Sequence, residues 1–378
     1  MRFPEFSGEW EKELLGTTCK VLMCKRILAS QTNSDCGVPF YKIGTIGGVP
    51  DAYISKELFE SYRAKYNYPR KGEVMITCAG TVGKAMIFDG HDSYYQDSNI
   101  VWIDNPTNTI DNTFLYHFIS KVDWSKLNTT TIVRIYNDDL RQLWISYPTL
   151  SEQRKISIFL NLLNQRIETQ KKIIEDLKKL KDAITHSHFK KELTHSPMVY
   201  IGQCISQVSK RNKDAKIDRV LSVSNRYGFI DQDEQFEDRE VASADTSNYK
   251  VVHKGVFAYN PARINVGSVA RLQEFENGIV SPMYVCFTAK KELFPAYFEL
   301  YLSTSIFKHE MNKRLEGSVR LCLTYESLCN IKIALPEFNV QKDFVSKVST
   351  ILTKIRAEER LLYLHHNCKQ YLLSQMFI

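Results

Sequence analysis

This sequence contains an internal repeat, and that repeat constrains its fold more than any other feature. A helical pattern follows Pro148 and Gln153, and the same pattern follows Pro336 and Gln341, 188 residues later. Shorter matches occur upstream in the same order: Leu15-Gly16 with Ile201-Gly202, Lys25-Arg26 with Lys210-Arg211, Lys71-Gly72 with Lys254-Gly255, and Val82-Gly83 with Val266-Gly267. Because two such periods fill the 378 residues, we expect two similar halves.

The two helical passages carry the same apolar spacing. Apolar residues recur in alternating steps of four and three, which is typical of a coiled-coil seam. The predicted helix-pairing residues are Ile156, Leu160, Leu163, Ile167, Ile174, Leu177 and Ile184 in the first passage, and Phe344, Val348, Ile351, Ile355, Leu362 and Leu372 in the second. A helix with one apolar stripe must bury it, so we expect the two to pack as an antiparallel coiled coil. Each is expected to span about 30–40 residues, or about 45–60 Å.

Polar residues interrupt this seam at equivalent places, Gln170 with Glu358 and Lys181 with Lys369. They either set the register, mark a place where another protein packs, or, for the lysines, extend toward solvent. Ser151, with the acid and amide that follow it, is the expected N-terminal cap of the first helix.

The passages before each helix have a different character. Short β-branched and aromatic runs, bounded by Gly, Asn and Asp, predict strands and turns, and short helices are expected over 112–119 and 295–307. The predicted fold class is α/β in the α+β sense, with two similar globular modules, each followed by a long helix, and an internal pseudo-two-fold axis. The predicted boundaries are 1–147 and 193–335 for the modules and 148–192 and 336–378 for the helical regions, with a linker at 194–197.

Composition excludes several protein classes. With 43% hydrophobic and 25% charged residues, the chain is not disordered throughout. No apolar run approaches the roughly 20 residues of a membrane helix, and the first residues do not read as a signal peptide. The nine cysteines include no pair with zinc-knuckle spacing, so we expect reduced thiols in a cytoplasmic protein. The net charge of +7 is compatible with a polyanionic partner.

A catalytic motif is missing from the sequence. Neither a phosphate-binding Gly-x-x-x-x-Gly-Lys loop nor a Gly-x-Gly-x-x-Gly turn occurs. Residues 259–262 only partly match the Asn-Pro-Pro-aromatic signature of amino-group methyltransferases, because the second proline and the aromatic are absent. His186 with His188, and His365 with His366, lack a third metal ligand nearby in the sequence. We therefore expect no catalytic residue and no metal site.

Several short sequence motifs occur in a fixed order along the chain, and their order is more informative than any single motif. They are Arg2-Phe3-Pro4-Glu5-Phe6 with Glu9-Trp10-Glu11, Lys71-Gly72-Glu73-Val74 leading into Gly80-Thr81-Val82-Gly83, Glu152-Gln153 before the first long helix, and residues 259–267 in the second half. This ordered set resembles the specificity subunit of type I restriction–modification systems over essentially the whole chain. The second copy departs from the pattern at Val340-Gln341, where the first has Glu152-Gln153.

The resemblance implies a function. The two modules would be target recognition domains that each read one half of a bipartite DNA site. The paired helices would set the spacer and dock two methyltransferase subunits, with restriction and translocase subunits joining the full complex. This chain would bind no cofactor and do no chemistry, since S-adenosylmethionine, ATP and Mg would belong to the partners. It would work in the cytoplasm of a bacterium or archaeon, away from membranes.

Candidate DNA-binding residues are basic, amide and hydroxyl side chains in predicted turns, because these groups meet phosphates and base edges. They are Lys42, Thr45, Thr81, Lys84 and Arg134 in the first module, and Lys210, Arg211, Arg226, Tyr227, Arg263, Asn265 and Arg320 in the second. Arg263 is the strongest of these predictions, while Arg134 and Arg320 occupy matching places before each helix. The alternative for each residue is a solvated surface charge or a side chain that stabilises its turn.

Two other functions remain open from the sequence. One alternative is a duplicated DNA-binding adaptor of another defence system, and the other is a coiled-coil scaffold that binds only proteins. A scaffold would show no salt-sensitive DNA binding, which distinguishes it from both DNA-binding interpretations.

Overall fold

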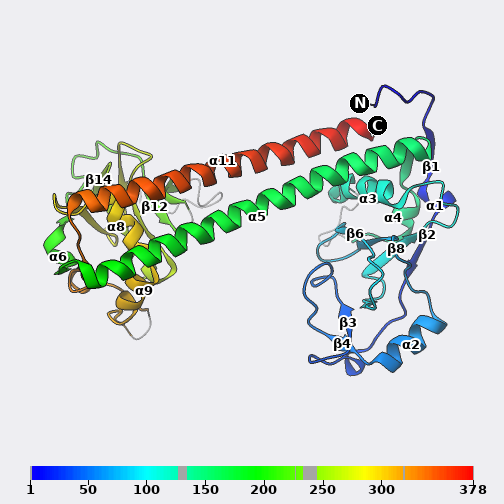
Figure 1. Ribbon diagram of the computed structural model, residues 1–378, viewed down its shortest axis with the longest axis horizontal. Coiled ribbons are helices and arrows are strands. Elements are labelled where there is room, and N and C mark those ends of the chain that lie inside the picture. Colours follow the sequence, from blue (N-terminus) through cyan, green and yellow to red (C-terminus); the bar gives the residue numbers. More distant parts are fainter. Residues whose placement is uncertain (1, 127–133, 226, 233–244, 318–319, 378) are drawn as a thin grey trace. The chain divides into compact units, whose positions relative to one another are not determined.

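The computed structural model describes residues 2–126, 134–225, 227–232, 245–317 and 320–377. They form two compact units, which we call the first unit (Met1–Lys171 with Arg360–Ile378) and the second unit (Lys172–Glu359). Two long helices, α5 (Leu150–His195) and α11 (Phe338–Met376), contribute to both units (Figure 1).

The first unit is built on an antiparallel sheet with the strand order β2-β8-β5-β6. A second sheet, β4-β3-β7, and a strand pair, β1 with β9, complete it. The strands are β1 (Glu11–Leu14), β2 (Lys20–Met23), β3 (Val38–Tyr41), β4 (Tyr53–Ile54), β5 (Val74–Thr77), β6 (Ala85–Ile87), β7 (Tyr94–Tyr95), β8 (Ile100–Asp104) and β9 (Trp144–Tyr147). The helices are α1 (Leu15–Thr18), η1 (Ala29–Gln31), α2 (Lys56–Lys65), α3 (Asn112–Lys121), η2 (Trp124–Lys126) and α4 (Asn137–Arg141).

The second unit repeats this plan. Its sheet has the order β11-β18-β15-β16, and β10 pairs with β19 as β1 pairs with β9. The strands are β10 (Met198–Tyr200), β11 (Ile205–Val208), β12 (Leu221–Ser224), β13 (Gly228–Asp231), β14 (Lys250–His253), β15 (Phe257–Tyr259), β16 (Val269–Arg271), β17 (Asn277–Val280), β18 (Val285–Ala289) and β19 (Lys332–Ala334). The helices are α6 (Ile201–Cys204), η3 (Ile264–Val266), α8 (Pro295–Leu302), α9 (Ser305–Asn312) and α10 (Tyr325–Cys329).

Continuous apolar runs form the central strands because both faces of each sheet are covered. In β5 all four residues are buried, and alternate side chains enter different cores. Val74 and Ile76 pack with α3 and the long helices, while Met75 packs on the opposite face with Trp102 and Tyr94. In the second unit, Phe257 and Tyr259 likewise face α8, and Ala258 faces β12 and β17.

The two long helices pack on each other in both units. The start of α5 lies beside the end of α11 in the first unit, where Ile156 and Leu160 share a core with Leu372. In the second unit the end of α5 lies beside the start of α11, where Phe189 shares a core with Phe344. This pairing is antiparallel, and with the two strand-rich modules it confirms the predicted fold class.

Most of the predicted helix-pairing residues are buried or half-buried. Ile156, Leu160, Ile167, Ile174, Phe344, Val348, Ile355 and Leu372 are buried, and Leu163, Leu177, Ile351 and Leu362 are half-buried. Ile184 differs, since it is 37% exposed and Thr185 is buried in its place. A straight helix drifts away from an exact seven-residue repeat, which accounts for this one-residue shift near the end of α5.

Each long helix ends inside the core of the other module. In the first unit, the ring of Phe377 at the end of α11 lies 4.8 Å from that of Phe114 in α3. In the second unit, the ring of Phe189 near the end of α5 lies 4.8 Å from that of Tyr297 in α8. Each core therefore depends on a helix that begins after the other module.

Four local predictions differ from the structure. The helix expected over 295–307 is two helices, because Thr304 Oγ1 accepts from the Phe307 amide and caps α9. Helix α5 reaches His195 and so includes part of the expected linker. It begins at Leu150. Two of the expected capping residues have other partners: Glu152 pairs with Arg2, and Gln153 bonds to the Asp111 amide and the Pro148 carbonyl. At 46 residues, α5 is also longer than expected.

Candidate nucleic-acid interface

Two turns of the first unit contact each other. One covers residues 42–48 after β3, and the other covers 78–84 between β5 and β6. The Lys84 ammonium donates to the Ile46 carbonyl at 2.6 Å. A Cβ added at Gly80 would lie 2.8 Å from the Ile43 Cδ1 atom, so the two turns pack closely. The contact brings two sequence-distant polar loops together.

The turn between β5 and β6 requires glycine at position 83. Its φ of +82° is disfavoured for residues with a side chain, and an added Cβ would lie 2.0 Å from Trp124 Cδ1. The Gly83 amide donates to the Thr77 carbonyl at 2.8 Å, and the Lys84 amide donates to Thr77 Oγ1 at 3.1 Å. The backbone and Trp124 together fix the shape of this turn.

Four of the five predicted residues of the first module lie on these two turns. Lys42 Nζ is 3.1 Å from Asp51 Oδ1, and Thr45 Oγ1 accepts from the Lys42 amide at 3.1 Å. Thr81 is exposed on the second turn, next to Lys84. Lys42 and Lys84 thus already have protein partners, and Thr45 helps to close its own turn.

The fifth residue, Arg134, adjoins the same region. Its Nη2 atom donates to Ser98 Oγ at 3.3 Å. The Cys78 amide donates to the Asn99 carbonyl, and the Ile135 amide donates to the Cys78 carbonyl, at 2.8 and 2.9 Å. These bonds hold the loop of Arg134 and the loop before β8 at the end of β5.

Polar residues that the sequence analysis did not select line two neighbouring hollows here. The larger is about 460 Å³ and the smaller about 260 Å³, and Arg26 and Asp97 line both. The unselected polar residues include Lys25, Arg26, Thr32, Lys65, Asn67, Gln96, Asp97, Ser98 and Asn99. The repeat gave a signal for Lys25 and Arg26, because their counterparts Lys210 and Arg211 are among the predictions. The others come from separate loops and have no local sequence signal.

Cys24 lines the larger hollow but is not poised as a nucleophile. Burial raises the pKa of its thiol to about 12, so the sulfur stays protonated at neutral pH. The chemistry of the hollow thus lies in its hydrogen-bonding groups and in the positive charges of Lys25, Arg26 and Lys65.

In the second unit, the equivalent turn covers residues 260–268 between β15 and β16. Gly267 has a φ of +93°, as Gly83 has +82° in the first unit. Ser268 Oγ donates to the Val223 carbonyl at 2.8 Å and ties the turn to β12. The two units therefore place a turn with a positive-φ glycine at the same position in the sheet.

Different side chains occupy this second turn. Arg263 and Asn265 are both exposed, and Arg263 lines a hollow of about 220 Å³ together with Asn260 and Tyr249. Arg320 is also exposed and lies in a hairpin beside the turn. The bond from the Leu323 amide to the Pro261 carbonyl, 3.1 Å long, holds that hairpin in place.

The remaining predicted residues of the second module lie on two further loops. Lys210 and Arg211 are exposed, and Arg211 Nη1 donates to Asn248 Oδ1 at 2.8 Å. Tyr227 is exposed in the turn that joins β12 and β13. Arg226 lies outside the described residues. The Lys210 carbonyl accepts from the Val251 amide, so this loop runs along β14.

His186 and His188, considered as metal ligands, have structural contacts. His188 stacks on Phe344 with the ring centroids 3.7 Å apart, and burial lowers its pKa. His186 Nδ1 lies 3.1 Å from Ser305 Oγ. Within the described ranges, no group of three or more His, Cys, Asp and Glu side chains is placed to hold a metal ion. The helices in the described part of the chain also include none long and apolar enough to cross a membrane.

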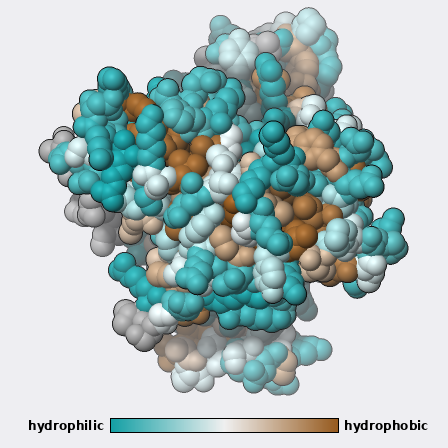
Figure 2. All heavy atoms as spheres, turned by 90° about the vertical axis from the view of Figure 1, so that its left-hand side faces the viewer, coloured by the Kyte–Doolittle hydropathy of each residue, from teal (hydrophilic) through white to brown (hydrophobic). Residues whose placement is uncertain are grey.

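Exposed polar side chains occupy turns in both units. Figure 2 shows one face on which hydrophilic residues predominate and hydrophobic ones form separate patches. Such a surface, with exposed Lys, Arg and amide side chains, is suited to contacts with phosphates and base edges.

Comparisons with known proteins agree with the earlier resemblance. Residues 7–179 match the family described as "Type I restriction modification DNA specificity domain". A curated type I restriction enzyme specificity subunit from Haemophilus influenzae is 54% identical over 142 residues, which cover 38% of this chain and 37% of that protein. The match therefore spans little more than a third of the curated relative.

Two solved structures share the fold over nearly the whole chain. The S subunit of the type I system from M. genitalium gives a TM-score of 0.58 at 17% identity, covering 100% of this chain and 99% of the other. A chain from a study of assembly and conformational transition of the type I system gives 0.60 at 15% identity, covering 98% of each. Residues 7–179 therefore match the type I restriction–modification DNA specificity family, and the chain as a whole shares the fold of these two solved type I structures.

Proposed function

We propose that this chain is the DNA specificity subunit of a type I restriction–modification complex. Residues 1–147 and 193–335 would be its two target recognition domains, each reading one half of a bipartite, asymmetric DNA site. The helical regions 148–192 and 336–378 would set the spacer between the half-sites and dock two methyltransferase subunits.

One observation carries this proposal: both modules place a turn with a positive-φ glycine after the second strand of the core sheet, but the two turns carry different side chains. Gly83 and Gly267 both have positive φ at the turn after the second core strand. The first turn carries Thr81 and Lys84, and the second carries Arg263 and Asn265. Since Arg favours guanine and Asn favours adenine in the major groove, different side chains imply different half-sites.

The candidate residues divide by chemistry. Six of them suit contacts with DNA phosphates, because their ammonium, guanidinium and hydroxyl groups can hold the DNA backbone without reading its sequence. They are Lys42, Thr45, Thr81, Lys84, Lys210 and Arg211. Arg134, Tyr227, Arg263, Asn265 and Arg320 suit base edges or the groove walls, and Arg226 belongs to the same set by sequence. Phosphate contacts would make the affinity fall steeply as salt is raised.

The chain itself would be non-catalytic. Adenine methylation with S-adenosylmethionine, and ATP- and Mg-dependent translocation and cleavage, would belong to methyltransferase and restriction subunits. A specificity subunit of this kind acts on the DNA of its own cell, so the cytoplasm of a bacterium or archaeon is the proposed location.

Methylation mapping tests the proposal. The chain and its cognate methyltransferase are expressed in a host without other adenine methylation, and single-molecule sequencing reports every modified adenine. We expect an asymmetric two-part motif with a fixed gap. Exchanging residues 1–147 for another module should change one half of the motif and leave the other half intact.

The variant Arg263→Ala should lose or relax the half read by the second module. Its control is Lys308→Ala, which removes an exposed positive charge from α9 in the same unit. A methyltransferase that is active with another specificity subunit, yet leaves no new motif with this chain, would contradict the proposed function. DNA binding that does not weaken with salt would also contradict it.

A further inference from the structure

Arg26 and Asp97 form a partly exposed ion pair in the first unit. Arg26 follows β2 and Asp97 precedes β8, so the sheet brings together two residues far apart in the sequence. Arg26 Nε lies 3.6 Å from Asp97 Oδ2, longer than a hydrogen bond. The Arg26 side chain is 75% exposed, whereas that of Asp97 is 21% exposed. Among the described residues Asp97 is the only polar partner of Arg26, so the guanidinium keeps donors for an external acceptor.

This pair stands between two hollows. The hollow of about 460 Å³ lies on one side, with Lys25, Lys65 and Asn67 on its walls. The hollow of about 260 Å³ lies on the other, with Gln96 and Asn99. Arg26 and Asp97 line both hollows, so a ligand in either one would meet this pair.

The carboxylate argues against a phosphate ligand for Arg26. A carboxylate so close to the guanidinium repels a phosphate, which carries a full negative charge, more strongly than it repels an uncharged base edge. A guanine offers two acceptors, O6 and N7, to a bidentate Arg, and the paired cytosine offers an N4 amine to a carboxylate. An Arg and Asp side by side therefore match a G·C pair better than the DNA backbone.

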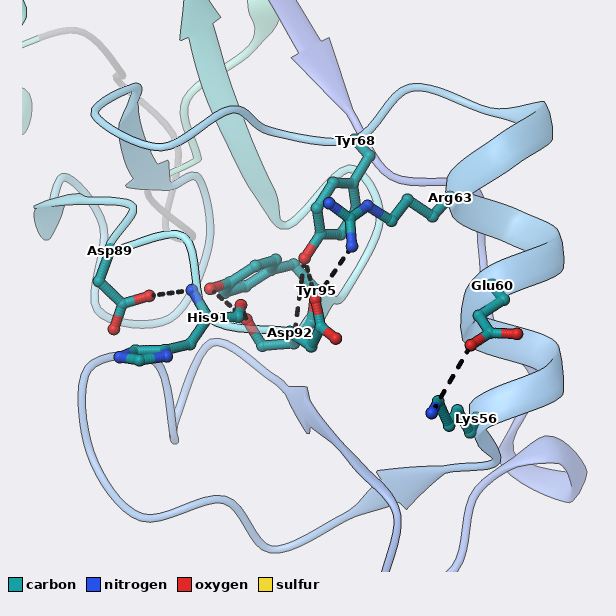
Figure 3. A network of polar contacts seen from close by, with 9 residues as sticks. Lys56, Glu60, Arg63, Tyr68, Asp89, His91, Asp92 and Tyr95 are labelled. Atoms are coloured by element: carbon teal, nitrogen blue, oxygen red, sulfur yellow. Dashed lines mark hydrogen bonds and ion pairs between the residues drawn. The ribbon is translucent and has the colours of Figure 1, made fainter.

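Other arginines of the first unit are less available. Arg63 donates to Asp92 at 3.0 Å and lies 5.1 Å from the Tyr68 ring centroid, as the network in Figure 3 shows. Arg70 pairs with both Glu73 and Asp104. These guanidiniums are committed to contacts within the protein, in contrast to that of Arg26.

We propose that Arg26 reads a guanine in the half-site of the first module, and that Asp97 positions it there. The inference rests on the proposed function and deepens it by naming a specificity-determining residue and its base. Arg26 would make the base contact, and Asp97 would restrict the rotamers of Arg26 so that less freedom is lost on binding.

The experiment maps methylation by the complete complex carrying Arg26→Ala, Arg26→Lys, Asp97→Asn or Asp97→Ala. In Arg26→Ala, discrimination at one guanine of the first half-site should fall roughly 10- to 100-fold, the range of a bidentate base contact. Arg26→Lys should restore part of that discrimination, because Lys also binds guanine O6 and N7. Asp97→Asn and Asp97→Ala should weaken discrimination at the same position and leave the rest of the motif unchanged.

The matched control is Lys56→Ala. Lys56 has the same 75% side-chain exposure as Arg26 and a loose pair with Glu60 at 3.9 Å in the same unit (Figure 3). This variant should leave the motif unchanged. Thermal unfolding of each variant, compared with that of Lys56→Ala, separates misfolding from loss of base recognition. Unchanged recognition of the second half-site serves as an internal control.

Two outcomes would overturn the inference while the proposed function stands. Arg26→Ala could keep full discrimination at every position, which would exclude Arg26 from base reading. Alternatively, it could weaken methylation of all sequences equally, which would make Arg26 a phosphate contact. A wild-type complex that produces no bipartite motif would instead contradict the proposed function, and this inference would fall with it.

Discussion

Gln153 and Gln341 make the same three hydrogen bonds at the starts of the two long helices. Gln153 Nε2 donates to the carbonyls of Pro148 and Thr109 at 2.7 and 3.0 Å, and its Oε1 accepts from the Asp111 amide at 2.6 Å. The equivalent partners of Gln341 are the carbonyls of Pro336 and Glu292, both at 2.9 Å, and the Phe294 amide at 2.8 Å. Both side chains are fully buried. Each therefore locks a long helix to the loop before a shorter one.

Replacing Gln153 should destabilise the first unit. In Gln153→Ala, two carbonyls and one amide lose their partners in a buried place, and we expect a loss of about 2–4 kcal/mol. Gln153→Glu should cost at least as much, because a carboxylate cannot donate to the two carbonyls. Chemical denaturation followed by circular dichroism measures the change.

The control is Gln142→Ala, which removes an exposed glutamine after α4. It should stay within about 0.5 kcal/mol of the wild type. Equal effects of both variants would show that the three bonds at Gln153 contribute little.

Truncation of Phe377 should loosen the first unit rather than the second. The ring packs against Phe114 and Phe118, and its loss leaves a cavity that should cost about 3–5 kcal/mol. Hydrogen exchange should quicken in α3 of Phe377→Ala and stay unchanged in α8. The reciprocal variant Phe189→Ala should quicken exchange in α8. Equal loss of exchange protection in α3 and α8 from either variant would contradict this prediction.

Burial of His117 should make the first unit sensitive to acid. Its Nε2 lies 3.0 Å from Asn161 Oδ1, and burial lowers its pKa to about 4. In the unfolded chain the imidazole titrates near 6.5. Since the unfolded state binds the proton more tightly, this contribution is complete above pH 6.5 and is lost as the pH falls toward 4. The shift corresponds to about 3 kcal/mol.

Stability measured at pH 7.5 and pH 4.5 tests this. The variant His117→Gln should reduce the difference between the two pH values. The exposed His366, changed to Gln as a control, should leave the difference as in the wild type. An unchanged pH dependence in His117→Gln would assign the acid sensitivity to other groups.

The equivalent glycines 83 and 267 should respond differently to alanine. Both have positive φ, which costs about 1–2 kcal/mol for a residue with a side chain. At Gly83 the added Cβ would also overlap with Trp124, whereas at Gly267 the nearest atom is 3.6 Å away. Gly83→Ala should therefore be more destabilising than Gly267→Ala in denaturation, and Gly44→Ala, with open space around it, should be neutral.

The same variants have distinct effects on methylation if the turns contact DNA. Gly83→Ala should impair recognition by the first module only. Loss of both half-sites in Gly83→Ala would mean that the turn acts on the assembly of the whole complex.

The sequence determined the repeat, the alternation of strand-rich modules with long helices, and most of the helix seam. These features follow from local rules, because an apolar residue every three or four positions needs a helical stripe, and continuous apolar runs such as 74–76 need burial on both faces. It also placed Lys42, Thr45, Thr81 and Lys84 in polar turns, where the structure finds them on two contacting loops.

Only the tertiary structure decided which distant groups meet. The sequence did not show that Phe377 and Phe189 enter the cores of the other modules, or that Gln153 bonds to the loop before α3 instead of capping its own helix. It also did not pair Arg26 with Asp97, because 71 positions separate them and the folded sheet alone brings them together. Local spacing fixes periodic structure, whereas contacts between loops depend on how the whole chain closes around its cores.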